Sequence, residues 1–276
     1  MWISISFILL ALSTIASAKS GSGKVNYIVG GQKIPVSDAP YQAALFRNYA
    51  FHCGGEIVAP IWILTAGHCV TSATGELFPV EEWLVRVGAN DANVNEEPDQ
   101  PVDTVFLHPF YAQEGVKLDY DTALMRLAAR LQFSDQVRCI PMVPPGTPAT
   151  TGTVAVVTGY GHSIPNSVGP PSSTQLKALE VAIFDHEDCQ QRYAAIGQAI
   201  TDRMFCAGAP AQGTCHYDSG GPAVQNGQLL GLVSGGSVCA ADQFPGIYAL
   251  ISTMWEWIEG TIVVNSEHYP PDGQCI

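Results

Sequence analysis

Three polar residues in this sequence carry the groups that nucleophilic catalysis at a carbonyl carbon requires. His68 lies in the stretch LTAGHC, Asp121 begins the stretch DTALM, and Ser219 lies in the stretch DSGGP. A serine hydroxyl becomes a nucleophile when a base takes its proton, and a carboxylate can fix the tautomer of that base and stabilise its cation. We therefore predict that the fold brings these three side chains together.

The elements that must position these residues are short and rich in β-forming side chains. Runs of this kind are separated by Gly, Pro, Asn and Asp, and examples are 41–46, 83–87, 154–158 and 229–233. This pattern is typical of β-barrels and sandwiches. Two segments have helical character: 185–195 begins with an acidic N-cap candidate, and 253–263 repeats apolar residues at helical spacing.

A proline-rich segment, PMVPPGTP at residues 141–148, lies near the middle of the chain. Such a composition suits a linker between two halves of similar size. We place the boundary between the halves there, and no internal repeat of solenoid length is present.

Further motifs flank the three chemical ones, namely IVGG from Ile28, CGG from Cys53 and PGIY from Pro245. With the order His, Asp, Ser, they make the sequence similar to the chymotrypsin/trypsin family of secreted serine endopeptidases. The resemblance implies an all-β fold of two packed six-stranded antiparallel β-barrels with a C-terminal helix. It also implies that His68, Asp121 and Ser219 form a catalytic triad that hydrolyses peptide bonds through an acyl-enzyme.

The N-terminal residues have the features of a secretory signal. Residues 1–18 contain an apolar run and end in Ala-Ser-Ala, and the run is too short to span a bilayer comfortably as an anchor. By resemblance, residues 19–27 are an activation peptide, and 28–276 are a peptidase domain with barrels at 28–140 and 141–276. Cleavage before Ile28 would free an amino group that pairs with Asp218. We therefore expect an extracellular zymogen.

The even number of cysteines, eight, in a chain with an export signal predicts disulfides. Zinc is the competing interpretation, but the sequence has no C-x-x-C or H-x-x-x-H pair. The resemblance pairs Cys53 with Cys69, Cys189 with Cys206, and Cys215 with Cys239. Cys139 and Cys275 remain as a fourth pair, with an intermolecular bridge as the alternative.

The resemblance also locates a substrate pocket. Its base is Gly213 followed by Thr214, and its walls are Gly236 and Gly246. Because no acid lies at the base, a Lys or Arg side chain would be buried without a counter-charge, and we expect apolar side chains instead. Wall glycines favour large aromatic groups, as in chymotrypsins, whereas Thr214 and Val238 favour the smaller groups that elastases accept. The residues expected to contact substrate are Gly213, Thr214, His216, Ser234, Gly236, Val238 and Gly246.

Two departures from the family bear on activity. Tyr217 stands where the family has glycine, and the backbone N–H groups of Tyr217 and Ser219 would form the oxyanion hole. Tyrosine lacks the conformational freedom of glycine, so a catalytically impaired homologue that acts as a binding or regulatory protein is the alternative function. Ser234-Gly235-Gly236 replaces the usual Ser-Trp-Gly, which removes an apolar wall.

The charge of the chain narrows its partners. A formal net charge of −13 disfavours nucleic acid and anionic membranes, and no later segment has the length of a spanning helix. We expect a monomer without cofactor or metal, whose partners are protein or peptide substrates and protein inhibitors. The acidic loop at 91–99 lies where some relatives bind calcium, but its first ligand-like position is Ala89, so a solvated loop is expected.

Overall fold

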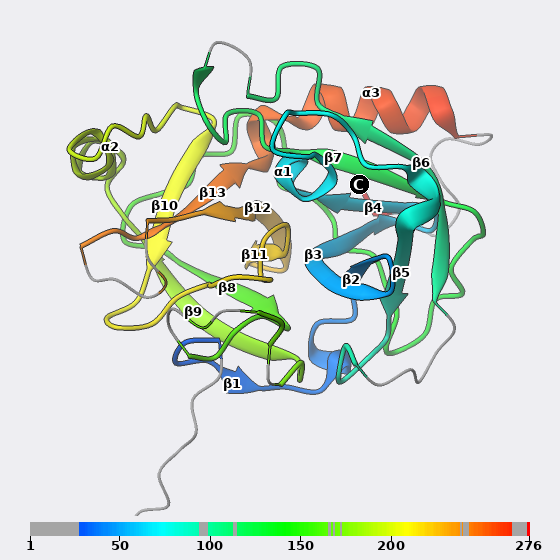
Figure 1. Cartoon of the computed structure of the whole chain (residues 1–276). Helices are drawn as coiled ribbons and strands as arrows, with labels where there is room; N and C mark the ends of the chain where they lie inside the picture. Colours follow the sequence, from blue (N-terminus) through cyan, green and yellow to red (C-terminus); the bar gives the residue numbers. More distant parts are fainter. Residues whose placement is uncertain are drawn as a thin grey trace, which may run out of the picture.

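Six antiparallel strands close the first barrel of the computed structural model, which describes residues 28–93, 99–112, 115–164, 167, 169–171, 173–237, 239, 243–266 and 275–276. The strands follow the order β2-β3-β4-β7-β6-β5, and β5 pairs again with β2 (Figure 1). They are β2 (Gln42–Arg47), β3 (Ala50–Ala59), β4 (Trp62–Thr65), β5 (Trp83–Val87), β6 (Gln100–Leu107) and β7 (Ala123–Leu127). The predicted signal and activation segments, residues 1–27, lie outside the described residues.

The second barrel is built from the later strands. The ring β8-β9-β10-β13-β12-β11 closes through the pairing of β11 with β8, and the short strand β1 (Gln32–Lys33) adds to β9. The strands are β8 (Val154–Gly159), β9 (Lys177–Ile183), β10 (Met204–Gly208), β11 (Pro222–Gln225), β12 (Gln228–Gly235) and β13 (Gly246–Leu250). The predicted fold of two six-stranded barrels is confirmed, and the proline-rich segment leads from β7 to β8.

Three α-helices lie outside the barrels in the part of the chain that the structure describes. They are α1 (Gly67–Val70), α2 (His186–Ala194) and α3 (Trp255–Asn265). Asp185 caps α2 as predicted, because its carboxylate accepts the backbone N–H of Asp188 at 3.0 Å. None of these described helices has the length and apolar character needed to cross a membrane.

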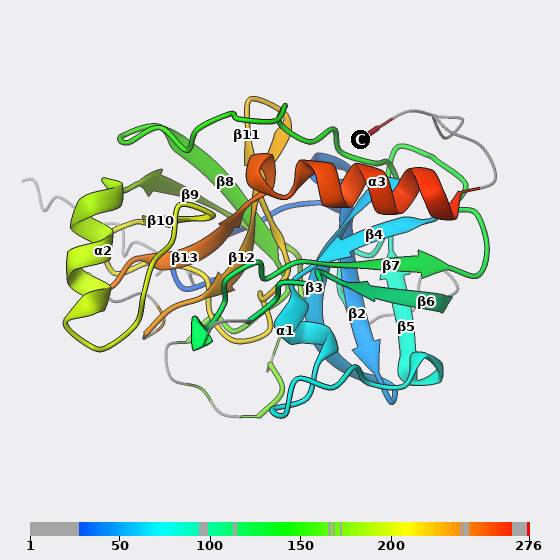
Figure 2. The ribbon, with the colours of Figure 1, turned by 90° about the horizontal axis from the view of Figure 1, so that it is seen from above.

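Helix α3 covers the junction of the barrels and runs alongside the first barrel (Figure 2). Its Ile258 and Ile262, which repeat at helical spacing, are fully buried. They belong to a core cluster that includes Trp62 and Leu124 of the first barrel and Val157 of the second. Burial of each isoleucine contributes about 1.5–3 kcal/mol, so α3 helps to hold the barrels together.

One buried residue does not fit an apolar core. Glu56 on β3 is fully buried, and neither carboxyl oxygen has a hydrogen-bond partner within the described chain. Burial alone raises the pKa of Glu56 well above its ordinary value. The carboxyl group is therefore held neutral in the folded protein over a wide pH range.

Candidate active site

The side chains of His68 and Asp121 are joined in the first barrel. Asp121 lies two residues before β7 and is completely buried, whereas the His68 side chain, on α1, is 28% exposed. The Asp121 carboxylate accepts the backbone N–H of His68 through Oδ1 and the ring Nδ1–H through Oδ2, both at 2.8 Å. Ser234 on β12 donates its hydroxyl to the same Oδ2. The second barrel thus helps to hold this carboxylate.

Opposing effects set the protonation of His68. Burial lowers the pKa of the imidazole, but the charge of Asp121 and its hydrogen bond raise it more, so the pKa lies above its ordinary value. Because Nδ1 is bonded to Asp121, Nε2 is the ring nitrogen that remains for proton exchange.

The turn that carries Ser219 is tied to the first barrel. The carbonyl of Ser219 accepts the backbone N–H of Gly54 on β3 at 2.8 Å. A Cβ on the following residue, Gly220, would come within 2.2 Å of Thr65 Oγ1, so only glycine permits this close approach to the segment before His68. Within the described chain, the Ser219 hydroxyl makes no hydrogen bond to His68 in this structure.

Tyr217 keeps a backbone conformation that glycine adopts readily. Its φ of 74° lies in the left-handed region, and its ring stacks on Phe51 with centroids 5.8 Å apart and planes inclined by 23°. His162 meets the same ring edge-on at 5.3 Å. The backbone N–H groups of Tyr217 and Ser219 donate to no oxygen of the described chain. The tyrosine ring therefore covers Phe51 while both N–H groups are left for a ligand.

A cavity of about 450 Å³ opens beside Ser219. Five of the seven predicted contact residues line it together with Ser219, namely Gly213, Thr214, His216, Gly236 and Gly246. The Ser234 side chain instead faces Asp121, and Val238 lies outside the described residues. Phe184 and Phe244 also line the cavity and were not predicted, although Phe244 directly precedes the PGIY motif. Both add apolar surface to the walls.

Leu118 occupies space beside the strand that lacks the usual tryptophan. A Cβ added to Gly235 would lie 2.6 Å from Leu118 Cδ1, so the leucine covers the backbone of β12 at this point. The sequence predicted that the apolar wall of the pocket is missing here. The structure instead shows a smaller apolar side chain that another segment supplies.

Asp218 is buried directly behind Ser219. Its carboxylate accepts the N–H groups of Gly161 at 2.8 Å and Cys215 at 3.0 Å. Burial raises the pKa of Asp218 to about 6, although these two hydrogen bonds and the charge of Lys177 oppose the rise. Ile28 is also buried, and the next residue, Val29, pairs with Gly213 at the cavity.

Four disulfides connect the cysteines as the resemblance implies. They are Cys53–Cys69, Cys139–Cys275, Cys189–Cys206 and Cys215–Cys239. The first lies beside His68, and Cys53, His68 and Cys69 form a group with the spacing of metal ligands. Because the two sulfurs are bonded to each other, they offer no thiolate to a metal ion.

Comparison with known proteins agrees with this geometry. The family model for trypsin matches residues 28–258. A vitellin-degrading protease of Bombyx mori is 35% identical over 237 residues, which span 85% of this chain and 85% of that protein. Trypsin II-P29 of Gallus gallus is 32% identical over 93% of this chain and 98% of its own. The structure of neuropsin, a serine protease of mouse brain, superposes with a TM-score of 0.73 at 29% identity, covering 84% of this chain and 98% of neuropsin.

The fold and the site together define a two-barrel serine peptidase. The similarity extends over both barrels and most of the described chain. The chain belongs to the trypsin family and is a serine endopeptidase, a hydrolase that acts on proteins. Its four disulfides are consistent with secretion.

Proposed function

We propose that His68, Asp121 and Ser219 are the catalytic triad of this enzyme. The supporting observation is the completely buried Asp121 carboxylate, which binds His68 Nδ1 and leaves Nε2 for the serine proton. Ser219 Oγ attacks the substrate carbonyl while Nε2 takes the hydroxyl proton, and the protonated ring then gives that proton to the leaving amine. Water hydrolyses the acyl-enzyme by the same route. A catalytic hydrogen bond often shortens only when substrate is bound, so the open Ser219–His68 contact agrees with this role.

The backbone N–H groups of Tyr217 and Ser219 form the oxyanion hole. Neither group has an acceptor in the described chain, and the positive φ of Tyr217 maintains the backbone shape that the family reaches with glycine. Loss of one oxyanion donor typically lowers the rate by about 10²–10³-fold, so the preserved N–H favours an active enzyme. The Tyr217 ring, held on Phe51, narrows the leaving-group side of the site.

The cavity supports cleavage after large apolar residues. Its described lining has no acid, and Phe184 and Phe244 add aromatic walls to those of Gly236 and Gly246. A substrate Arg or Lys would therefore be desolvated without a counter-charge. The open volume favours aromatic side chains over the small ones that elastases prefer.

The enzyme is secreted as a zymogen and is activated by cleavage after Tyr27. Asp218, next to Ser219, is buried, and Ile28 is buried as well. A new amino group at Ile28 would give the carboxylate a partner of opposite charge, as a buried charge requires. Trypsin could cut after Lys24, but that would leave three extra residues on the new terminus.

Ser219→Ala tests the catalytic assignment. The variant should fold like the wild type and lose amidase activity, and a fluorophosphonate probe should label activated wild type but not the variant. Ser134→Ala, which alters an exposed hydroxyl on a loop of the first barrel, is the matched control and should keep both activity and labelling. Failure of the activated wild type to react would favour the alternative, an impaired homologue that acts as a binding protein.

A further inference from the structure

The segment that leads to Asp121 has an unusual backbone. Leu118 and Tyr120 flank Asp119 and adopt positive φ angles of 65° and 52°. Neither residue is glycine, so this conformation is unfavourable and persists only where surrounding contacts hold it. Tyr120 is bonded directly to Asp121, and a relaxation of its backbone would therefore reorient the Asp121 carboxylate.

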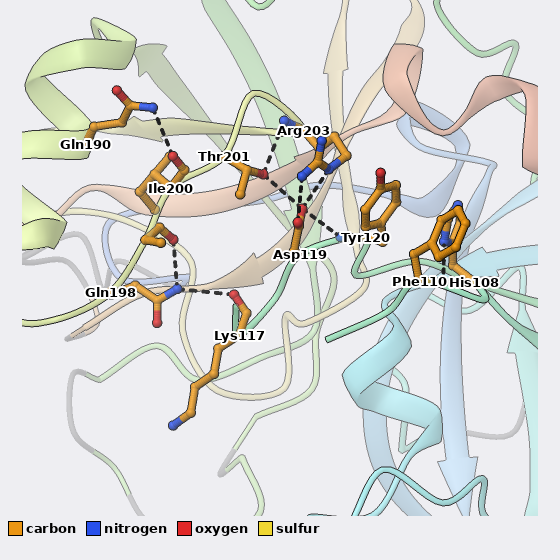
Figure 3. Close-up of polar contacts among 11 residues, drawn as sticks. His108, Phe110, Lys117, Asp119, Tyr120, Gln190, Gln198, Ile200, Thr201 and Arg203 are labelled. Atoms are coloured by element: carbon orange, nitrogen blue, oxygen red, sulfur yellow. Dashed lines mark hydrogen bonds and ion pairs between the residues drawn. The ribbon is translucent and has the colours of Figure 1, made fainter. Parts of the chain in front are cut away.

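Asp119 connects this segment to the second barrel through hydrogen bonds. Its carboxylate accepts Arg203 Nε at 2.8 Å, Arg203 Nη2 at 2.7 Å and Thr201 Oγ1 at 2.9 Å (Figure 3). The Asp119 side chain is only 9% exposed. Arg203 is itself anchored, because its carbonyl accepts the backbone N–H of Leu250 at the end of β13. This bidentate geometry fixes the orientation of the two side chains as well as the distance between them.

An aromatic stack supports the same segment. The Arg203 guanidinium carbon lies 4.3 Å from the centroid of the Tyr120 ring, and the His108 ring stacks on Tyr120 with centroids 4.6 Å apart. Figure 3 shows Arg203, Tyr120 and His108 in this succession. Trp257 of α3 contacts His108 at 4.8 Å. Tyr120 is thus held between a cation from the second barrel and an imidazole from the first.

A second contact joins the segment to the second barrel. Gln198 Nε2 donates to the carbonyl of Lys117 at 3.2 Å (Figure 3). The residues on both sides of Leu118 are therefore bound to the loop between α2 and β10. At the C-terminal end of the segment, the backbone N–H of Thr122 donates to the carbonyl of Tyr120 at 2.7 Å.

We propose that Arg203 is a positioning residue for the reaction, which acts through Asp119 and Tyr120 to keep the Asp121 carboxylate aligned with His68. This inference rests on the proposed triad. Removal of the guanidinium would leave the Asp119 carboxylate largely buried with a single side-chain donor and would release the Tyr120 ring. The segment would then relax away from its left-handed conformation, and the two hydrogen bonds from Asp121 to His68 would lengthen.

The inference predicts a change in the pKa of His68. Asp121 is the group that raises this pKa against burial, so a displaced carboxylate should lower it. The titratable groups near His68 in the described chain include His52 on β3 and Tyr111, and neither contacts Arg203. Burial lowers the pKa of His108, which packs against Tyr120, to about 4, and the charge of Arg203 contributes to this lowering. Loss of Arg203 would therefore raise the pKa of His108, which is opposite to the change expected for His68.

The test compares activated Arg203→Met with wild type on a short ester or anilide substrate that carries one apolar residue. We expect kcat to fall at least about tenfold with KM changed less than about threefold, and the acidic limb of the pH–kcat profile to move to lower pH. Arg203→Lys keeps the charge but lacks the planar fork, so it should show the same changes to a smaller extent. If Arg203→Met does not fold, the kinetics of Arg203→Lys are compared with those of wild type instead. Arg138→Met, which removes an exposed ion pair with Asp135 on a loop of the first barrel, is the matched control and should retain wild-type kinetics.

A double-mutant cycle with Asp119→Asn adds a second criterion. If Arg203 acts through Asp119, the double variant should be no slower than Arg203→Met alone. An unchanged kcat and pH profile in a folded Arg203 variant would overturn the inference, even if its melting temperature falls. Stoichiometric fluorophosphonate labelling of wild-type Ser219 in the same experiment establishes the triad separately, so failure of the proposed function is distinguished from failure of this inference.

Discussion

Replacement of Tyr217 with glycine separates the structural role of this residue from its effect on ligands. A non-glycine residue in the left-handed region costs about 1–2 kcal/mol. The contacts of the Tyr217 ring with Phe51 and His162 each contribute about 0.5–1.5 kcal/mol. These terms nearly cancel, so Tyr217→Gly should change the free energy of unfolding by no more than about 1 kcal/mol.

Tyr217→Ala is the matched control, because it removes the ring but keeps a Cβ at φ 74°. Alanine loses both ring contacts and retains the backbone strain, so it should destabilise the protein by about 1–3 kcal/mol. The two variants should nevertheless bind a standard-mechanism protein inhibitor at least about tenfold more tightly, roughly 1.4 kcal/mol, because both clear the leaving-group side.

Denaturant unfolding and inhibition constants measure the two effects. Substrates without residues after the scissile bond should be cleaved by Tyr217→Gly at the wild-type rate, since they do not reach the ring. The reasoning would be refuted if Tyr217→Gly kept both its inhibitor affinity and its turnover of long peptides within about twofold of wild type. Equal destabilisation by glycine and alanine would show that the backbone of Tyr217 is not strained.

Three further predictions concern the core, the pocket and activation. Glu56→Gln should raise the melting temperature at about pH 8 but leave it nearly unchanged at about pH 4. The free-energy cost of keeping Glu56 buried, where its ionisation is disfavoured, is absent below the ordinary pKa of the carboxyl group and grows as the pH rises above that value. An equal shift at both pH values would contradict this. Gly213→Asp should raise kcat/KM for an arginyl substrate at least about tenfold relative to a phenylalanyl one, whereas Gly213→Asn, without the charge, should not. Chymotrypsin should activate the proenzyme to a form that starts at Ile28. N-terminal sequencing and activity measurements check this, and activation by trypsin alone would disprove it.

The local pattern of residues was sufficient to predict most elements of the fold. Strand β5 has the predicted bounds, and the other three predicted β runs overlap β2, β8 and β12. Asp185 caps α2, and buried Ile258 and Ile262 lie on one face of α3 as their spacing indicated. These features depend on turn chemistry, capping and hydrophobic periodicity, which involve residues close together in the chain.

The three chemical residues could also be identified from their motifs, but their surroundings could not. The Asp121–Ser234 bond, the Tyr217 ring on Phe51 and the Leu118 side chain over Gly235 all join segments far apart in the sequence.

The ion pair between Arg203 and Asp119 also joins segments far apart in the sequence, and neither residue belongs to a motif. The sequence by itself determined which groups could perform the chemistry and which segments form strands. Closure and packing of the two barrels decided which distant side chains meet, because those contacts depend on strand register and on the space that neighbouring residues leave.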